Sequence, residues 1–430
     1  MNVAMAFLQL GTGCIVAYYE YRRSSISVFL WATLLLMFGF PHCVTVLCGT
    51  FDYDPVTMLQ ASLFVVLFNT AYLVARIITS GGKNQNTLNF REQSEDNQQT
   101  LRSTRSLHLV TILCICIFAS LFIRVVFAVL FFGGLEATSW AAFYALPHSP
   151  YDFNMISILL GVSDTLLLAA GGIVLTFWIS RKYFSSIACM LAILGYAIIT
   201  RNRVTILPVL VSIILLYISK NKKIGIKQVL SLAILAICIV YTVDGLRVFR
   251  HYGTVAQFRE MFDFRDFNRR VWQMITTGEG ELGLRNIFYY FLEHDNRFPQ
   301  FGEARTYVRL LLMPLPSKYS FGLKPPDFAV SMGSAYIGDF SNTMISVHPT
   351  LYGDCYANLG WFGILLAIFW AVFAFTIDKI ADRKNLVLKS VLLVVFGCMY
   401  VIIGRGSVYN GCYMGFVSAI FLFVAAAVVP

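Results

Sequence analysis

The segment from His348 to Gly360 carries polar side chains capable of acid–base chemistry, directly before a long apolar stretch. A hydroxyl group that attacks another molecule needs a base within hydrogen-bond reach, and an imidazole or a carboxylate can serve as that base. We therefore predict that His348 or Asp354 is the catalytic base. Their alternative roles are structural: His348 could cap backbone groups in a loop, and Asp354 could be the N-cap of the next helix. The other polar residues of the segment are candidate contacts for the acceptor: Tyr352, Tyr356 and Asn358.

Arginine is concentrated in a polar insert, Asp244 to Tyr356, which overlaps this segment. The insert contains ten Arg, two Lys and twelve acidic residues, so its formal charge is near zero and its bias is toward arginine rather than toward positive charge. A planar guanidinium group can bind phosphate through two parallel hydrogen bonds, which an ammonium group cannot do. The structural alternative, pairing of Arg with Asp and Glu on a solvated domain, accounts for more than half of these side chains.

Further basic side chains lie in or beside apolar stretches. Arg124 is inside the apolar run Leu121 to Val126, where an unpaired guanidinium costs at least about 2.5–3.5 kcal/mol, so a partner must compensate it. Arg201 and Arg203 share a short turn, and Arg405 has the equivalent position before the last apolar stretch. These side chains could extend to lipid headgroups or bind a lipid-attached diphosphate. The candidate diphosphate ligands are Arg124, Arg201, Arg203, Arg285, Arg309, Lys324 and Arg405.

Metal and cysteine chemistry are not expected. Asp52 and Asp54 are separated by one residue and could hold a divalent cation, but Pro55 directly afterwards favours a turn and the start of a helix. We predict no metal site and no cofactor. The ten cysteines follow neither a disulfide framework nor a zinc motif, and we expect them to be small packing residues.

The elements that must position these groups are membrane-spanning helices. Hydrophobic residues make up 58% of the chain, charged residues only 13%, and the mean hydropathy is +0.69, which one soluble core cannot accommodate. A spanning helix needs about 20 mostly apolar residues. We predict about 11 such helices, at Val3 to Tyr19, Val28 to Cys48, Val56 to Ile78, Leu107 to Phe132, Met155 to Ser180, Phe184 to Thr200, Val204 to Ser219, Ile226 to Val243, Leu359 to Phe375, Leu386 to Ile403 and Cys412 to Val429. The first is expected to be a retained helix rather than a signal peptide.

Lysine and arginine in the short loops predict the orientation of these helices. Short cytoplasmic loops are enriched in both residues, and the loops alternate cleanly when the N-terminus lies outside the cytoplasm and the C-terminus inside it. The insert, the turn from Arg201 to Arg203 and the turn from Arg405 to Asn410 then face outside. The net charge of +10 is explained by cytoplasmic loops that face anionic lipid, so nucleic acid is not an expected partner.

The predicted organisation is an all-α polytopic membrane protein in three parts. Residues 1–243 form an N-terminal membrane part with about eight spans, residues 244–356 a helical periplasmic loop domain, and residues 357–430 a C-terminal membrane part with about three spans. Residues 80–106 are polar and are expected to be a linker.

Within the loop domain, Val255 to Thr277 has the pattern of an amphipathic helix at a membrane interface. The segments from Ile287 to Phe291 and from Val308 to Leu312 are expected to pack on it. Pro314 and Pro316 then end the helical pattern.

Three local patterns stand out in the sequence. The turn Thr200 to Arg203 precedes an apolar run, Met313 to Pro316 is followed by Lys324 and Pro325, and Gly353 to Gly360 leads into a late apolar stretch. Together with the hydropathy profile, these patterns resemble the Wzy-type O-antigen polymerases of bacterial envelopes. The first is similar to an arginine-bearing turn of that family, the second to its proline-rich element that ends in Lys-Pro, and the third to its Gly-Glu-x-Tyr-x-Asn-Phe-Gly entry to a late span.

The resemblance implies a glycosyltransferase of the type C membrane class (GT-C-like) that acts at the periplasmic face of the bacterial inner membrane. Donor and acceptor would be glycan repeat units on undecaprenyl pyrophosphate, and undecaprenyl pyrophosphate would be the leaving group. The family resemblance also implies a separate chain-length regulator protein as a partner. Asp354 replaces the usual Glu, and Leu315 stands where an Arg often follows the first Pro, so the catalytic assignment is weaker than the family assignment.

Two other functions remain open. An O-antigen ligase would move the finished glycan from the same lipid carrier to the lipid A core, and it too has a large outer loop and a basic cavity. A lipid-linked oligosaccharide flippase or other transporter needs a central cavity but no large outer domain, so the insert argues against it. A purely structural scaffold would leave Arg124 unexplained.

Overall fold

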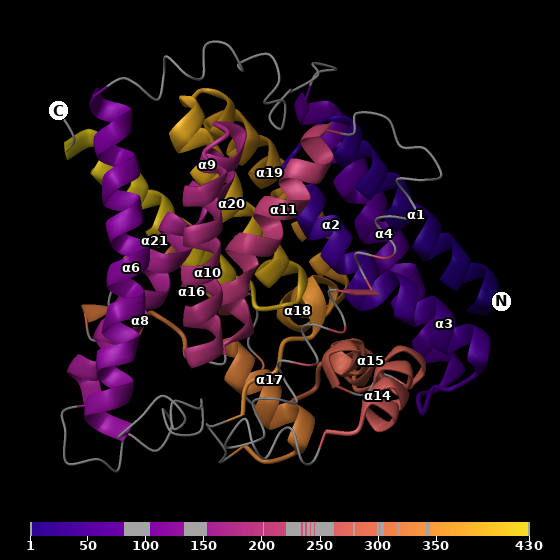
Figure 1. Ribbon diagram of the computed structural model, residues 1–430. Helices are drawn as coiled ribbons and strands as arrows, with labels where there is room; N and C mark the ends of the chain where they lie inside the picture. The colour runs from indigo at the N-terminus through magenta and orange to yellow at the C-terminus, as the bar shows by residue number, and fades with distance from the viewer. Residues whose placement is uncertain are drawn as a thin grey trace. The chain divides into compact units, whose positions relative to one another are not determined.

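The computed structural model describes residues 2–80, 104–132, 153–200, 202–220, 262–277, 280–298, 301, 305–315, 319–340 and 345–428, together with isolated positions between 234 and 245. Every regular element in these ranges is helical. Nine helical segments in them are long and apolar enough to cross a membrane. The fold is therefore that of a helical polytopic membrane protein (Figure 1).

Some predictions fall outside the described ranges. They are the linker, nearly all of the eighth expected span (Ile226 to Val243), Arg201, Pro316 and the first part of the expected amphipathic helix.

Nine expected spans are present, and eight of them lie close to their predicted bounds; the ninth, expected from Leu359 to Phe375, runs from Thr350 to Asp382 and begins inside the predicted loop domain. The helices that form eight of them are α1 (Asn2–Arg22), α2 (Val28–Leu34) with α3 (Phe40–Cys48), α4 (Pro55–Ser80), α6 (Thr104–Phe132), α8 (Phe153–Gly171) with α9 (Ile173–Ile179), α10 (Tyr183–Thr200), α20 (Leu386–Gly404) and α21 (Val408–Val428). The ninth is formed by α18 (Thr350–Leu359) with α19 (Leu366–Asp382). The expected span Val204 to Ser219 is formed by a short 3-10 turn and α11 (Leu207–Lys220), whose 14 residues fall short of the roughly 20 that a crossing requires.

Three of the spans are interrupted. A π-helical turn, Leu35–Gly39, joins α2 to α3, and Gly172 separates α8 from α9. The third break follows α18 at Gly360, where a φ of +56° is easy for glycine and ends the helix. A 3-10 turn, Gly360–Leu365, then leads into α19. Departures from α-helical geometry inside helices often occur at functional positions.

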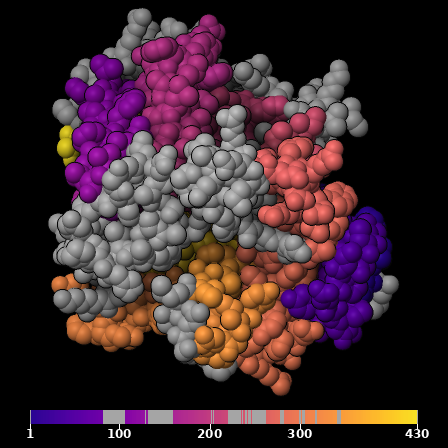
Figure 2. All heavy atoms as spheres, turned by 60° about the horizontal axis from the view of Figure 1, so that its bottom comes forward, coloured from indigo at the N-terminus to yellow at the C-terminus, as the bar shows by residue number. Residues whose placement is uncertain are grey.

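The chain forms two compact units that alternate along the sequence. Unit 1 consists of Met1–Thr87, Arg269–Ile380 and Met399–Tyr413. In it α1 packs along α4, and α15 (Leu284–Glu293) packs on α18 and α4. Figure 2 shows the coral segment that includes α15 beside the indigo N-terminal helices.

Unit 2 consists of Leu88–Asn268, Ala381–Cys398 and Met414–Pro430. Its α6 packs against α8 and α10, and α10 packs against α9. The part of α20 that belongs to this unit is almost completely buried, with Val391, Leu392 and Leu393 each 0% exposed.

The described part of the insert is helical as well. It contains α14 (Phe264–Thr276), α15, α16 (Arg305–Leu311) and α17 (Phe328–Ile337). The α14 helix is amphipathic as expected, since Phe267, Val271 and Met274 are buried whereas Arg265, Arg269 and Arg270 are exposed. Trp272, which was expected on the apolar side, is 64% exposed.

The start of α15 contacts the end of α14 through Arg285, which donates to the carbonyl of Ile275 at 3.0 Å. The Phe288 ring of α15 packs 5.5 Å from that of Phe64 on α4, a contact that was not expected. The helical pattern of α16 ends before Pro314, as predicted.

Candidate functional site

Asp354 lies in the second turn of α18 and is 2% exposed. Its carboxylate accepts hydrogen bonds from Thr306 Oγ1 on α16 at 3.3 Å and from Asn358 Nδ2 at 3.1 Å. Asn358 in turn accepts from the backbone N–H of Thr306 at 2.9 Å. Among the described residues no ion pair involves Asp354. Pro349 takes the N-cap position, so the proposed capping role of Asp354 is wrong.

The turn between α20 and α21 packs directly on the start of α18. The carbonyl of Arg405 accepts a hydrogen bond from the backbone N–H of Thr350 at 3.2 Å. Gly406 has a φ of +100°, and a Cβ there would lie 2.5 Å from the Thr350 nitrogen and 2.9 Å from the His348 carbonyl carbon, so only glycine permits this approach. Thr350 itself has a φ of +65°, which is costly for a β-branched residue. Such strain is concentrated at functional sites.

Arg309 joins α16 to the same region of unit 1. Its guanidinium carbon lies 4.5 Å from the ring centroid of Tyr409, at the start of α21, and its Nη1 donates to the carbonyl of Pro325 at 2.6 Å. Lys324 Nζ donates to the carbonyl of Leu315 at 2.8 Å. Both predicted anion ligands therefore contact neighbouring backbone carbonyls in this conformation.

Unit 1 thus brings together several predicted site residues from three distant stretches of sequence. The stretches are residues 305–309 on α16, residues 348–358 at and in α18, and residues 405–409 at the start of α21. The predicted residues concerned are His348, Asp354, Asn358, Arg309 and Arg405. We refer to this group, with Thr306 and Thr350, as the α18 site.

The side chain of Arg285 is buried and forms hydrogen bonds within the protein. It is 0% exposed, and its guanidinium donates to Thr45 Oγ1 at 2.8 Å, to the carbonyl of Leu282 at 2.9 Å and to that of Ile275 at 3.0 Å. The carbonyl of Ile275 belongs to the last turn of α14, so Arg285 satisfies a helix end. Burial lowers the pKa of this guanidinium from its ordinary value.

The two predicted tyrosine contacts are also buried. Tyr352 is 2% exposed and its hydroxyl donates to Asn69 Oδ1 at 2.9 Å. Tyr356 is 3% exposed, and its ring centroid lies 5.6 Å from that of Phe64 and 5.9 Å from that of Phe288. Both side chains therefore pack in the aromatic core of unit 1 in this conformation.

Arg124 in unit 2 has the partner that its position demanded. Its Nη2 lies 2.9 Å from Asp164 Oδ1, and its Nε donates to Tyr196 Oη at 2.8 Å and to Ser163 Oγ at 3.1 Å. The Tyr196 hydroxyl also donates to Asp164 at 2.5 Å. The sequence analysis did not single out Asp164, although an acidic residue inside the apolar stretch from Met155 to Ser180 was an available signal.

The two arginines of the predicted turn are described only in part. Arg203 begins a 3-10 turn, Arg203–Ile206, in unit 2, and Asn202 caps this turn through a hydrogen bond from the backbone N–H of Val204 at 3.1 Å. The side chain of Arg203 and all of Arg201 lie outside the described residues. The role of Arg201 and Arg203 as diphosphate ligands stays a prediction.

Asp54 has a structural partner at the start of α4. Its Oδ1 accepts a hydrogen bond from the backbone N–H of Val56 at 2.9 Å, which satisfies one of the free donors at the helix N-terminus. The geometry favours the turn and helix start that Pro55 indicated. No group of three or more potential metal ligands is found in the part of the chain that the structure describes.

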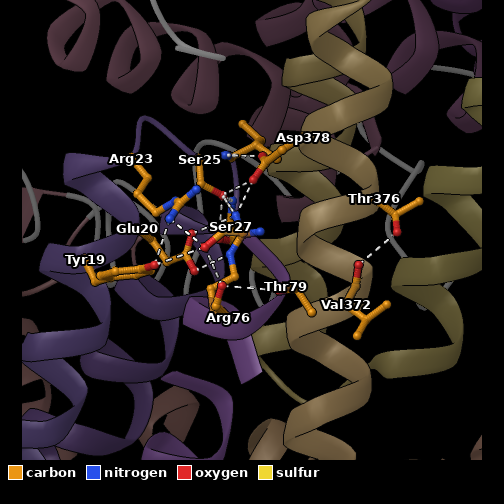
Figure 3. A network of polar contacts seen from close by, with 12 residues as sticks. Tyr19, Glu20, Arg23, Ser25, Ser27, Arg76, Thr79, Val372, Thr376 and Asp378 are labelled. Carbon is orange, nitrogen blue, oxygen red and sulfur yellow. Dashed lines mark hydrogen bonds and ion pairs between the residues drawn. The ribbon is translucent and has the colours of Figure 1, made fainter. Parts of the chain in front are cut away.

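A second buried polar cluster lies elsewhere in unit 1 (Figure 3). Arg76 on α4 donates from Nε to Glu20 Oε1 on α1 at 2.7 Å and from Nη2 to the carboxylate of Asp378 on α19. All three side chains are 0% exposed. Asp378 also accepts from Ser25 Oγ at 2.7 Å and from the backbone N–H of Ile26 at 3.1 Å. We refer to Glu20, Arg76 and Asp378 as the Arg76 cluster; the sequence analysis did not identify it.

Comparison with known proteins adds no assignment. No protein-family model, curated protein or solved structure matches the chain.

Proposed function

We propose that the chain is a membrane glycosyltransferase that polymerises oligosaccharide repeat units linked to undecaprenyl pyrophosphate, as in O-antigen synthesis, at the periplasmic face of the inner membrane. The observation that carries the proposal is the α18 site: Asp354 is buried next to a hydroxyl group, and segments that carry Arg309 and Arg405 meet around it. The local sequence resemblance gives the substrate class.

In the proposed reaction Asp354 removes the proton from a hydroxyl of the acceptor glycan. That oxygen attacks the anomeric carbon of the donor, a new glycosidic bond forms, and the bond between the anomeric carbon and the diphosphate oxygen breaks. In this conformation the Thr306 hydroxyl occupies the position next to Asp354, and the acceptor hydroxyl would replace it. Polyprenyl diphosphate leaves as an anion, which guanidinium groups such as those of Arg309 and Arg405 would stabilise.

The direct test incubates the full chain, purified in detergent, with carrier-linked repeat units. These repeat units are extracted from the organism that makes the protein. We expect a ladder of longer carrier-linked glycans, and no ladder with Asp354→Asn. Asp52→Asn is a matched control at an exposed carboxylate and should retain the ladder.

Two results would contradict the proposal. One is a wild-type protein that never lengthens the carrier-linked glycan, and the other is an Asp354→Asn protein with full activity. Transfer of glycan to added lipid A core without any ladder would instead identify a ligase.

A further inference from the structure

The segment after α16 exposes an unusual set of large apolar side chains. In the described residues 311–315 and 319–323, Phe321 is 93% exposed, Leu311 82% and Leu323 69%. The same segment exposes Tyr319 by 63% and Leu315 by 43%. A contiguous exposed apolar surface in a folded protein indicates a partner or a membrane. We refer to these five side chains as the apolar loop surface.

Hydrogen bonds at both sides of this segment close it into a loop. Arg309, just before it, donates to the carbonyl of Pro325, just after it, at 2.6 Å. Lys324 at its end donates to the carbonyl of Leu315 at 2.8 Å. The loop therefore has Arg309 and Lys324 at its base and apolar side chains between them, and Lys318 is a third cation in a part of the loop that lies outside the described residues. A segment that enters a lipid interface combines apolar side chains with cations that reach the headgroups.

The tip of the loop is strained. Phe321 has a φ of +49° and the following Gly322 a φ of +79°. The left-handed region suits glycine but is a genuine outlier for a bulky side chain. The strain directs an aromatic ring into the surroundings instead of into the protein interior, and a favourable interaction outside the chain would offset it.

A contact with a membrane span fixes the level of the loop. The Arg309 guanidinium stacks 4.5 Å from the ring of Tyr409, the second residue of α21, which is one of the candidate membrane spans. Leu311 follows Arg309 by two residues, so the loop begins close to the N-terminal end of this candidate span. Arg309 and Tyr409 both belong to unit 1.

We propose that the loop from Leu311 to Leu323 inserts its apolar surface into the membrane leaflet at which α21 begins. The occupant of this surface is lipid acyl chain, and Phe321, at the tip of the loop, reaches deepest. The inference does not depend on the proposed glycosyltransferase activity.

The test is Phe321→Trp in the full chain, reconstituted into phosphatidylcholine vesicles with or without lipids brominated on the acyl chain. The emission of the added Trp is obtained as the difference from wild type. We expect it to be blue-shifted, to lose most of its intensity in brominated vesicles, and to be insensitive to acrylamide in the water. Arg297→Trp, at a side chain that is 85% exposed, is the control and should be quenched by acrylamide and little by bromine.

Two outcomes would overturn the proposal. If the added Trp is quenched by acrylamide and not by brominated lipid, the loop lies in water. If neither quenches it, another protein surface or a second copy covers the loop. Leu323→Trp gives the same measurement if Phe321→Trp does not fold.

Discussion

Unit 1 buries carboxylates in two regions, and the partners of these carboxylates differ. In the Arg76 cluster Glu20 and Asp378 share one guanidinium, and hydroxyl and backbone donors surround them. In the α18 site Asp354 has a hydroxyl and an amide as partners. The first region connects α1, α4 and α19, whereas the second connects a short helix of the insert to α18.

The difference separates a structural site from a candidate catalytic one. In the Arg76 cluster each buried carboxylate has a cation as a direct partner, although the two carboxylates share it, and hydroxyl and backbone donors add to that compensation. A buried carboxylate among neutral partners carries an uncompensated cost, and proteins keep such groups where chemistry needs them. The strained Thr350 beside the α18 site supports the same distinction.

The largest effect is expected from Arg76→Leu. It leaves Glu20 and Asp378 buried without their cation, and breaking a buried pair in this way costs about 3–5 kcal/mol. We expect loss of the monodisperse protein peak in size-exclusion chromatography and a much lower melting temperature in detergent. Arg22→Leu, at an exposed arginine of α1, should leave both unchanged. An Arg76→Leu protein with the melting temperature of wild type would show that the Arg76 cluster does not stabilise the fold.

Asp354→Asn and Asp378→Asn should separate the two regions. Asn at 354 keeps the shape and one accepting oxygen for Asn358 Nδ2, and its amide N–H can donate to the Thr306 hydroxyl where the carboxylate accepted, so we expect a stability change within about 1.5 kcal/mol. The rate of glycan lengthening should fall by about 10²–10⁴, because a general base is removed.

Asp378→Asn should show the reverse pattern, with reduced stability and a normal rate per folded molecule. The measurements are the melting temperature in detergent and the ladder assay on the same preparations. Equal losses of stability in the two variants, with no difference in rate, would mean that both carboxylates are structural.

The membrane spans were predictable because an apolar run of about 20 residues is a local property of the sequence. The need for a partner of Arg124 was equally predictable from its apolar surroundings. The identity of that partner was not, since Asp164 is on α8, and only tertiary packing brings α8 beside α6. The Arg76 cluster was not predicted for the same reason, because its three charged residues lie on three helices that are far apart in sequence.

The α18 site shows where sequence patterns stop being informative. The segment before Gly360 was predicted to carry catalytic residues, and in the structure Asp354 accepts a hydrogen bond from Thr306, a residue that no sequence pattern indicated. Tyr352 and Tyr356 were predicted to contact the acceptor, yet both are buried. Burial depends on the packing of α15 and α4 around α18, which no local pattern specifies.

A smaller effect is expected at the Arg124–Asp164 pair, which is partly accessible, with 13% and 26% of the side chains exposed. Arg124→Leu and Asp164→Leu should each destabilise unit 2, and the double variant should be less destabilised than their sum by about 1–2 kcal/mol. Thermal melting of the three variants in detergent measures this coupling. Additive losses would show that the pair is not energetically coupled.

The same variants test the predicted diphosphate role of Arg124. If the arginine is structural, lengthening activity should recover in the double variant together with stability. If Arg124 binds the diphosphate, activity should stay low in the double variant even though the protein is folded.

The smallest effect is expected at Asp54, whose carboxylate has a backbone N–H as its partner. Asp54→Ala should lower stability by about 1 kcal/mol, as for other capping residues, and Asp54→Asn should restore most of it because its amide oxygen can cap as well. Asp52→Ala, with no comparable contact to the helix start among the described hydrogen bonds, should change the melting temperature little. A divalent-cation site predicts a different set of results: both Asp→Ala variants and a chelator would lower the melting temperature, and Asp54→Asn would not rescue it. Asn can replace Asp as a helix cap but lacks the negative charge with which a carboxylate holds a divalent cation. The Asp54→Asn variant therefore decides whether Asp54 is a structural carboxylate, like those of the Arg76 cluster, or a functional one, like Asp354.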